Sequence, residues 1–237
     1  MDRWWLALLL AWGAGLAMVA AGLLARWERI RPQWLEQEFR HAVIAFGGGA
    51  LLAAVALVLV PEGVRELAPL AVCVCLSAGG LAFMLLDVQL AAHKSSASQL
   101  VAMLADYLPE ALALGAVFAH GKSTASLLAL LIAIQNFPEG FNAYRELTQL
   151  SGFSSKRVLW TLLFASLLGP LAAAIGLFAL ASQPSIVGGV MLFAAGGILY
   201  LTFQDIAPQA RLQRHWGPPL GAVAGFLLGV LGEMLIP

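Results

Sequence analysis

Long apolar runs alternate with short polar connections along the whole chain. Eight apolar segments follow one another, each long enough to cross a bilayer, which takes about 20 residues of helix; they span residues 4–25, 41–61, 68–92, 99–120, 124–147, 157–181, 185–207 and 216–236. The period-two alternation over about ten residues that marks the strands of a membrane barrel is not found. The pattern therefore predicts an all-α integral membrane protein, with eight transmembrane helices in one domain over residues 1–237.

Composition agrees with a protein that lies mostly within lipid. Of the 237 residues, 61% are hydrophobic and only 11% are charged, whereas a soluble domain carries about 25% charged residues. The formal net charge is zero, which gives no indication of nucleic-acid binding. The first apolar run is too long for the core of a signal peptide. The longest connection, residues 26–41, mixes charges with two Trp, which favours a helix on the membrane surface.

Basic residues indicate the orientation, because cytoplasmic loops carry an excess of Lys and Arg. With the amino terminus outside, the inner loops hold ten of the 13 basic residues and the outer segments hold three. The ten are Arg26, Arg29, Arg31, Arg40, Lys94, Arg145, Lys156, Arg157, Arg211 and Arg214. We therefore expect both termini on the periplasmic or extracellular side.

Two polar motifs interrupt the fourth and fifth apolar segments. They read "DYLPEALALG" at 106–115 and "QNFPEGFNAY" at 135–144. Asp106 and Glu110 are four residues apart and share one helix face, and Gln135 and Glu139 repeat that spacing. Each pair brackets a proline, which cannot donate to the helix and so frees a backbone carbonyl. Consecutive antiparallel helices joined by a short turn can bring the two pairs together.

Both pairs are expected near the middle of the bilayer, since each lies roughly 7 to 15 residues into its helix at 1.5 Å per residue. A carboxylate facing lipid would cost about 3 kcal/mol or more. No Lys, Arg or His lies at this depth, so the missing positive charge is either protons or a bound cation. Carboxylate, amide and carbonyl oxygens form a site for a divalent cation. The alternative is a pair of proline kinks that each carry a protonated glutamate.

With these motifs the sequence resembles the ZIP (Zrt/Irt-like) family of divalent metal transporters. "QNFPEG" is similar to the fifth-helix motif H-N-x-P-E-G in the form found in the bacterial GufA-like branch, and "DYLPEALALG" to the fourth-helix motif. "VLVPEG" at 58–63, "FMLLD" at 83–87 and "DIAP" at 205–208 resemble the second, third and seventh helices. The chain departs from the family where Asp106 replaces a histidine, Tyr107 replaces an asparagine, and Gly169 stands where a glutamate often precedes the sixth-helix proline.

The resemblance implies a metal site made by Asp106, Glu110, Gln135 and Glu139. Asn136, with the shared glutamates, would be what remains of a second adjacent site. Without imidazole, oxygen ligands favour ions such as Mn²⁺, with Fe²⁺ intermediate and Zn²⁺ still accepted.

The candidate pathway residues lie outside this set. Asn142 and Tyr144 continue the polar stripe of the fifth helix toward the cytoplasm. Glu62 follows the second-helix proline and Asp205 precedes the seventh-helix proline. Their positions fit a 3+2+3 arrangement, in which helices 1–3 and 6–8 are inverted repeats around the central pair.

We therefore predict a transporter that moves a divalent metal ion, such as Zn, Fe or Mn, into the cytoplasm, and not an enzyme. The family resemblance implies alternating access by an elevator-like motion of helices 1, 4, 5 and 6, a homodimer, and a bacterial inner membrane location. The alternatives are a non-transporting metal-binding or sensor protein of the same fold and an intramembrane hydrolase. The hydrolase lacks a His base and a Ser or Cys at the depth of the motifs.

Overall fold

The computed structural model describes residues 4–27, 33–93, 98–119, 122–149, 152–210 and 216–236. Helices make up almost all of these residues, and no strand occurs among them, as predicted. The elements are α1 (Trp4–Trp27), α2 (Gln33–Ala53), η1 (Ala54–Leu59), α3 (Val60–Arg65), α4 (Pro69–His93), α5 (Ser98–Phe118), α6 (Lys122–Gln149), α7 (Ser155–Ser166), α8 (Leu168–Ile175), η2 (Gly176–Leu180), α9 (Pro184–Leu201), η3 (Thr202–Ile206), α10 (Ala207–Gln209) and α11 (Gly217–Leu235).

The elements join into spans that follow the eight apolar segments. Three spans are composite: α2, η1 and α3 are consecutive, as are α7, α8 and η2, and α9, η3 and α10. Among the described residues, seven spans are long and apolar enough to cross a membrane. The 28-residue α6 is not one of the seven, because its polar residues from Gln135 onward lower its hydropathy. Counting α6 as a span gives the eight that were expected.

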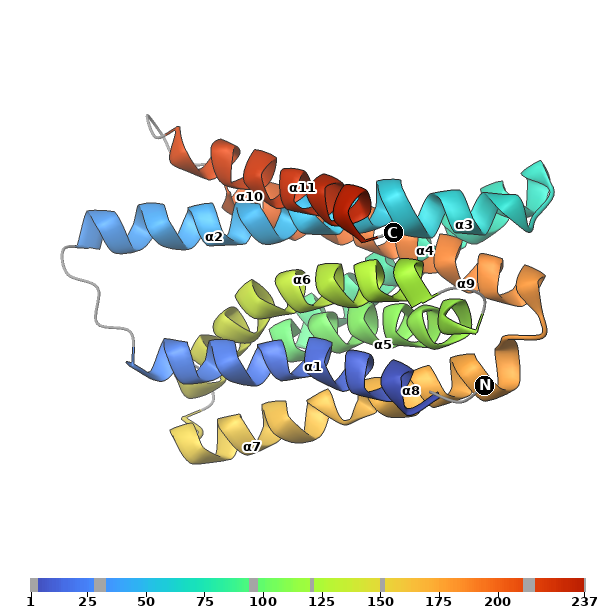
Figure 1. The fold of residues 1–237 in the computed structure, drawn as a ribbon. Coiled ribbons are helices and arrows are strands. Elements are labelled where there is room, and N and C mark those ends of the chain that lie inside the picture. The colour runs from blue at the N-terminus through green and yellow to red at the C-terminus, as the bar shows by residue number, and fades with distance from the viewer. Residues whose placement is uncertain are drawn as a thin grey trace.

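The expected surface helix at residues 26–41 is wrong in its second half. Residues 33–41 belong to α2, which continues without a break into the second membrane span. Figure 1 shows α2 as one straight rod. Mixed charge alone did not distinguish a separate surface helix from the first turns of a longer helix. Residues 28–32 lie outside the described residues.

The helices pack as two groups. The first, here called the site group, contains α1, α5, α6, α7 and α8, which pack against one another. The second, here called the frame group, contains α2, α3, α4, α9 and α11, with α2 packed on α11 and α4 and α3 packed on α9. In Figure 1, α5 and α6 run through the middle of the bundle, with α1, α7 and α8 below them and α2 and α11 above. The groups meet chiefly where α6 contacts α2 and α5 contacts α9.

The packing has the symmetry expected of a 3+2+3 arrangement. The second span packs on the eighth (α2 on α11), and the third packs on the seventh (α4 on α9). In inverted repeats of spans 1–3 and 6–8, the second span corresponds to the seventh and the third to the eighth. The pair formed by spans 2 and 8 therefore corresponds to the pair formed by spans 7 and 3. A π-helical turn also precedes a proline in both the second and seventh spans, η1 before Pro61 and η3 before Pro208.

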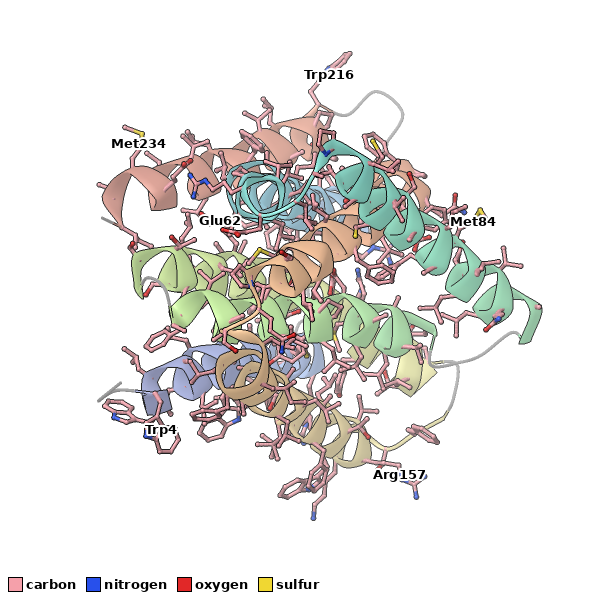
Figure 2. All side chains as sticks on the ribbon, turned by 90° about the vertical axis from the view of Figure 1, so that its right-hand side faces the viewer. Trp4, Glu62, Met84, Arg157, Trp216 and Met234 are labelled. Carbon is pink, nitrogen blue, oxygen red and sulfur yellow. The ribbon has the colours of Figure 1, made fainter. Side chains whose placement is uncertain are left out.

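Large apolar side chains are exposed on the outer surface, as expected of a membrane protein. Trp4, Trp216 and Met234 are 50%, 80% and 74% exposed, and Figure 2 shows them pointing outward from the periphery of the bundle. The buried core, by contrast, lies around α5 and α6. An apolar exterior around a more polar centre is the arrangement that a lipid solvent favours.

Candidate metal centre between α5 and α6

The structure brings the two polar motifs together, as their spacing predicts. The side-chain amide of Gln135 on α6 donates hydrogen bonds to two carboxylates of α5, to Glu110 Oε2 at 2.5 Å and to Asp106 Oδ2 at 3.3 Å. The four-residue spacing of Asp106 and Glu110 places them on one face of α5, so that a single amide reaches both. The geometry therefore joins the two central helices through polar side chains deep in the bundle.

These groups are shielded from solvent almost completely. Asp106 is 2% exposed, and Glu110, Gln135 and Asn136 are 0% exposed. A carboxylate in such a place is costly unless it is paired, protonated or bound to a cation. No Lys, Arg or His appears among the buried polar residues of the described chain.

Hydrogen bonds satisfy only part of this cluster. Among the described residues, six buried side-chain atoms have no hydrogen-bond partner, and all six are oxygens. Five belong to the residues expected to hold a metal: Asp106 Oδ1, Glu110 Oε1, Gln135 Oε1, Asn136 Oδ1 and Glu139 Oε2. Buried polar groups in native proteins nearly always have a partner, so a concentration of exceptions calls for an explanation. Oxygen ligands of this kind are what hard divalent cations take.

The three carboxylates are not arranged around one point, however. In the part of the chain that the structure describes, no three His, Cys, Asp or Glu side chains form a group that could hold a metal ion. The amide nitrogen of Gln135 lies between Asp106 and Glu110 and donates to both. Glu139, one turn further along α6, lines a cavity instead. If the Gln135 amide turned over, its oxygen would face the two carboxylates in place of its nitrogen.

That cavity lies between the two helix groups and reaches the site from one end. Gln135, Pro138, Glu139 and Asn142 line its α6 wall, and Asp205 lies on the opposite wall. The remaining lining residues are Ile44, Gly47, Gly48, Leu51, Ala102, Met103, Leu201 and Ile206. The cavity is therefore at the end where α5 begins and α6 ends.

The four candidate pathway residues divide into two pairs. Asn142 and Asp205 line the cavity. Tyr144 does not, since it is buried against α7, where its hydroxyl group lies 2.5 Å from Ser155 Oγ. Glu62 belongs to α3, which lies at the right-hand end of the bundle in Figure 1, and its carboxylate accepts a 2.6 Å hydrogen bond from Arg65. Of the two polar residues expected on α6, only Asn142 lines the cavity. Of the two acidic residues beside prolines, only Asp205 does.

Asn136 and Tyr107 connect the centre to α1. Asn136 Nδ2 donates to Ala14 O at 3.1 Å, and the Tyr107 hydroxyl group donates to Ala11 O at 2.7 Å. The same hydroxyl group lies 3.4 Å from Ser166 O at the end of α7. Asn136 therefore faces α1 rather than the carboxylates. The two side chains flank the centre and hold α1 against both central helices.

The position of Tyr107 depends on two glycines. A Cβ atom at Gly15 or at Gly169 would collide with the Tyr107 hydroxyl group. The fully buried phenol thus fills a notch between α1 and the start of α8. Tyr107 and Gly169 are two departures from the family pattern that lie far apart in the sequence. The structure shows that they are one packing arrangement, because the missing side chain at 169 makes room for the added ring.

Thr202 is a polar residue that sequence analysis missed. It is 4% exposed, and its hydroxyl group has no hydrogen-bond partner. It begins η3, the π-helical turn that also contains Asp205. π-helical turns inside helices occur frequently at functional sites. The run "TFQD" at 202–205, which is polar within the seventh apolar segment, was the available signal.

The fold and this centre define a class: a multi-pass α-helical membrane protein with a buried carboxylate–amide centre reached by a cavity between two helix groups. Comparison with known sequences is more specific. The family model described as "ZIP Zinc transporter" matches residues 95–236, more than half of the chain. The chain therefore belongs to the ZIP zinc transporter family. That family consists of transporters, not of enzymes, and its members carry zinc and related divalent metals as substrates.

Two curated relatives resemble a shorter part of the chain. The zinc transporters ZIP11 of Homo sapiens and of Bos taurus are each 34% identical to it over 85 residues. The matched segment covers 34% of this chain and 25% of each relative. The chain thus matches about a quarter of the length of these relatives.

Proposed function

We propose that the protein carries divalent metal cations across the membrane, and that Asp106, Glu110, Gln135 and Glu139 hold the ion midway, with Asn136 beside them. The observation that supports this most strongly is the set of five buried oxygens without hydrogen-bond partners, one on each of these residues. A cation that displaces the Gln135 amide nitrogen from the carboxylates would gain ligands and also neutralise their charge.

The donor set favours some metals over others. Carboxylate and amide oxygens suit Mn²⁺, and they also accept Fe²⁺ and Zn²⁺, whereas a histidine would have favoured zinc. Asp106 stands where the family motif has histidine. The proposed substrates are therefore Zn²⁺, Fe²⁺ and Mn²⁺, with a weaker bias toward zinc than in a site that contains histidine.

Transport toward the cytoplasm fits the position of the cavity. It opens at the end where α5 begins and α6 ends, which is the end with the basic connections. In this orientation the structure is open to the cytoplasm, both termini lie on the other side, and Asn142 and Asp205 lie on the exit path. A bacterial inner membrane and a homodimer complete the proposal and rest on the family resemblance.

Alternating access fits the division into two helix groups. Glu139 and Asn142 line the cavity from the site group, while Gly47 and Gly48 line it from α2 of the frame group. Asp205 lines it from η3, which continues α9 of the frame group. An elevator-like shift of the site group along the frame group would close the cavity at one end and expose the centre at the other. Small residues on the frame side suit such a sliding contact.

Uptake into proteoliposomes tests the proposal. The purified chain is reconstituted, and the entry of Zn²⁺, Fe²⁺, Mn²⁺, Mg²⁺ and Ca²⁺ is followed with an enclosed metal-sensitive dye. We expect uptake of one or more of the first three. The Glu110→Gln and Glu139→Gln variants should lose it, because each removes an anionic ligand.

Glu66→Gln provides the matched control, since Glu66 is exposed at the far end of α3 and should not affect transport. Metal binding without uptake by the wild-type chain would contradict transport and favour the sensor alternative. Full activity of both site variants would mean that the ion does not use these carboxylates.

A further inference from the structure

A second hollow lies beside the transport cavity and has a different chemistry. It is a groove between α1, α2 and α6, lined mainly by apolar side chains with two arginines. The lining residues are Leu24, Phe39, Arg40, Val43, Ile44, Phe137, Pro138, Phe141, Asn142 and Arg145. Among these described residues there is no Asp or Glu. The groove therefore combines an apolar lining with two guanidinium groups, each of which has several hydrogen-bond donors.

The two charges lie at the same end of the groove. α2 and α6 run in opposite directions past it (Figure 1), so Arg40 precedes Val43 and Ile44 of α2 while Arg145 follows Phe141 of α6. Phe39 lies next to Arg40 at the same end. From Arg145 to Phe137 is eight residues of helix, or roughly 12 Å. Both arginines thus lie at one end of the groove, and Val43, Phe137 and Phe141 extend from them toward the middle of the bundle.

This order matches one kind of molecule in a bilayer, a phospholipid with an anionic headgroup. We propose that the groove binds a single anionic phospholipid, with its phosphate at Arg40 and Arg145 and an acyl chain along Val43, Phe137 and Phe141. Basic pockets between transmembrane helices on the cytoplasmic side are known settings for such headgroups. The Arg145 guanidinium lies 5.0 Å from the Phe141 ring centroid, which holds the charge over the apolar floor.

The position of the groove suggests that a bound lipid affects how the two helix groups are arranged. Its walls come from both helix groups, with α1 and α6 on one side and α2 on the other. Ile44, Pro138 and Asn142 line both this groove and the transport cavity. A bound lipid therefore contacts both groups next to the ion path and stabilises the arrangement in which the cavity is open. Any effect on transport rests on the proposed function, whereas lipid binding itself does not.

The test measures lipid retention by the full chain. The protein is placed in nanodiscs of phosphatidylcholine alone, or of phosphatidylcholine with a minority of phosphatidylglycerol. Lipids that remain after extraction are counted by native mass spectrometry, and thermal unfolding is followed in parallel. We expect one retained phosphatidylglycerol and a higher unfolding midpoint in the mixed discs. The Arg40→Gln/Arg145→Gln variant should retain this lipid about 10- to 30-fold less well.

The chain offers a matched control for charge. Arg157 on α7 lies 5.1 Å from the Phe153 ring centroid, so it repeats the arginine–aromatic pair outside the groove. Arg157→Gln should leave lipid retention unchanged. An equal loss in Arg157→Gln would show general surface attraction and would overturn the proposal.

Two further variants test the acyl chain separately from the charge. Val43→Trp and Leu24→Trp fill the groove and keep both arginines, so each should lose the retained lipid while its unfolding midpoint in pure phosphatidylcholine stays unchanged. If either folded variant retained the lipid normally, the acyl chain would not lie there. Equal stabilisation by inorganic phosphate in phosphatidylcholine discs would also overturn the proposal, as would a change of oligomeric state in these variants without loss of lipid.

Discussion

The helices of the two groups are held together by different kinds of contact. Apolar helices in lipid gain little hydrophobic free energy from association, so close packing and interhelical hydrogen bonds must hold them. The frame group relies on glycine: a Cβ at Gly49 of α2 would strike the Ala222 carbonyl of α11, and one at Gly225 would strike that of Phe46. α4 and α9 repeat this arrangement through Gly79 and Gly196.

The site group adds polar contacts to close packing. Gln135, Asn136 and Tyr107 all donate hydrogen bonds to neighbouring helices from within the core. In the frame group a side-chain hydrogen bond between helices joins the Tyr200 hydroxyl group to Asp87 Oδ2 at 2.9 Å, at the edge of the core. The polar side chains of the site group also leave buried oxygen atoms without hydrogen-bond partners. Under the proposed function these atoms bind the ion, whereas the glycine contacts of the frame group offer no such atoms.

The largest effect should come from removing a site carboxylate. Glu110→Gln removes one negative charge and one ligand while it preserves shape, and we expect metal affinity to fall by about 100-fold or more, which corresponds to roughly 2.8 kcal/mol. Isothermal titration of the purified protein with Mn²⁺ or Zn²⁺ measures it. The unfolding midpoint without metal should rise or stay constant, because a buried charge has been removed. An unchanged affinity would show that the polar contacts of this group are structural only.

A glycine substitution in the frame group should lower stability and leave metal affinity unchanged. Gly79→Ala drives a methyl group into the Phe193 carbonyl, and overpacking of this kind costs about 1–3 kcal/mol. Stability should fall, while the metal affinity of the folded protein stays unchanged. Gly80→Ala is the control on the same helix, since its Cβ would make an ordinary contact with Gly196 O. Equal loss of stability in both variants would contradict the role given to close glycine packing.

The choice of metal should respond to Asp106. Asp106→His replaces a carboxylate with an imidazole, and the ratio of affinities should shift toward Zn²⁺ over Mn²⁺ by about tenfold. Competition titrations with the two ions measure the ratio directly. A constant ratio would mean that Asp106 does not contact the ion, and that its hydrogen bond to Gln135 is its whole contribution.

The smallest effect expected is that of the Tyr107 hydroxyl group. Tyr107→Phe keeps the ring in its notch and removes one donor, so stability should fall by about 1 kcal/mol, with little change in metal affinity. Gly169→Ala should destabilise the wild type more than it destabilises Tyr107→Ala, since the smaller side chain leaves room for the added methyl group. Strict additivity in this double-mutant cycle would show that the two positions do not interact.

The sequence predicted the helices well where long apolar runs defined them. Their number and order, and the pairing of the two proline motifs, follow from hydropathy, residue spacing and short connections. Prediction was weaker at residues 33–41, where charge indicated a surface helix but the backbone continues into α2. Tyr144 and Glu62 do not line the cavity, and polarity and depth along a helix did not reveal which way their side chains face.

The class of protein and the residue types at its centre follow from the sequence alone. Apolar length requires membrane spans, and carboxylates without basic partners at mid-depth require protons or a cation. Other features are visible only in the three-dimensional structure. Gln135 lies between the two α5 carboxylates, and Tyr107 fills a space left by Gly15 and Gly169. A cavity also runs between the helix groups. These features depend on contacts between distant helices, and spacing along one helix carries no information about such contacts.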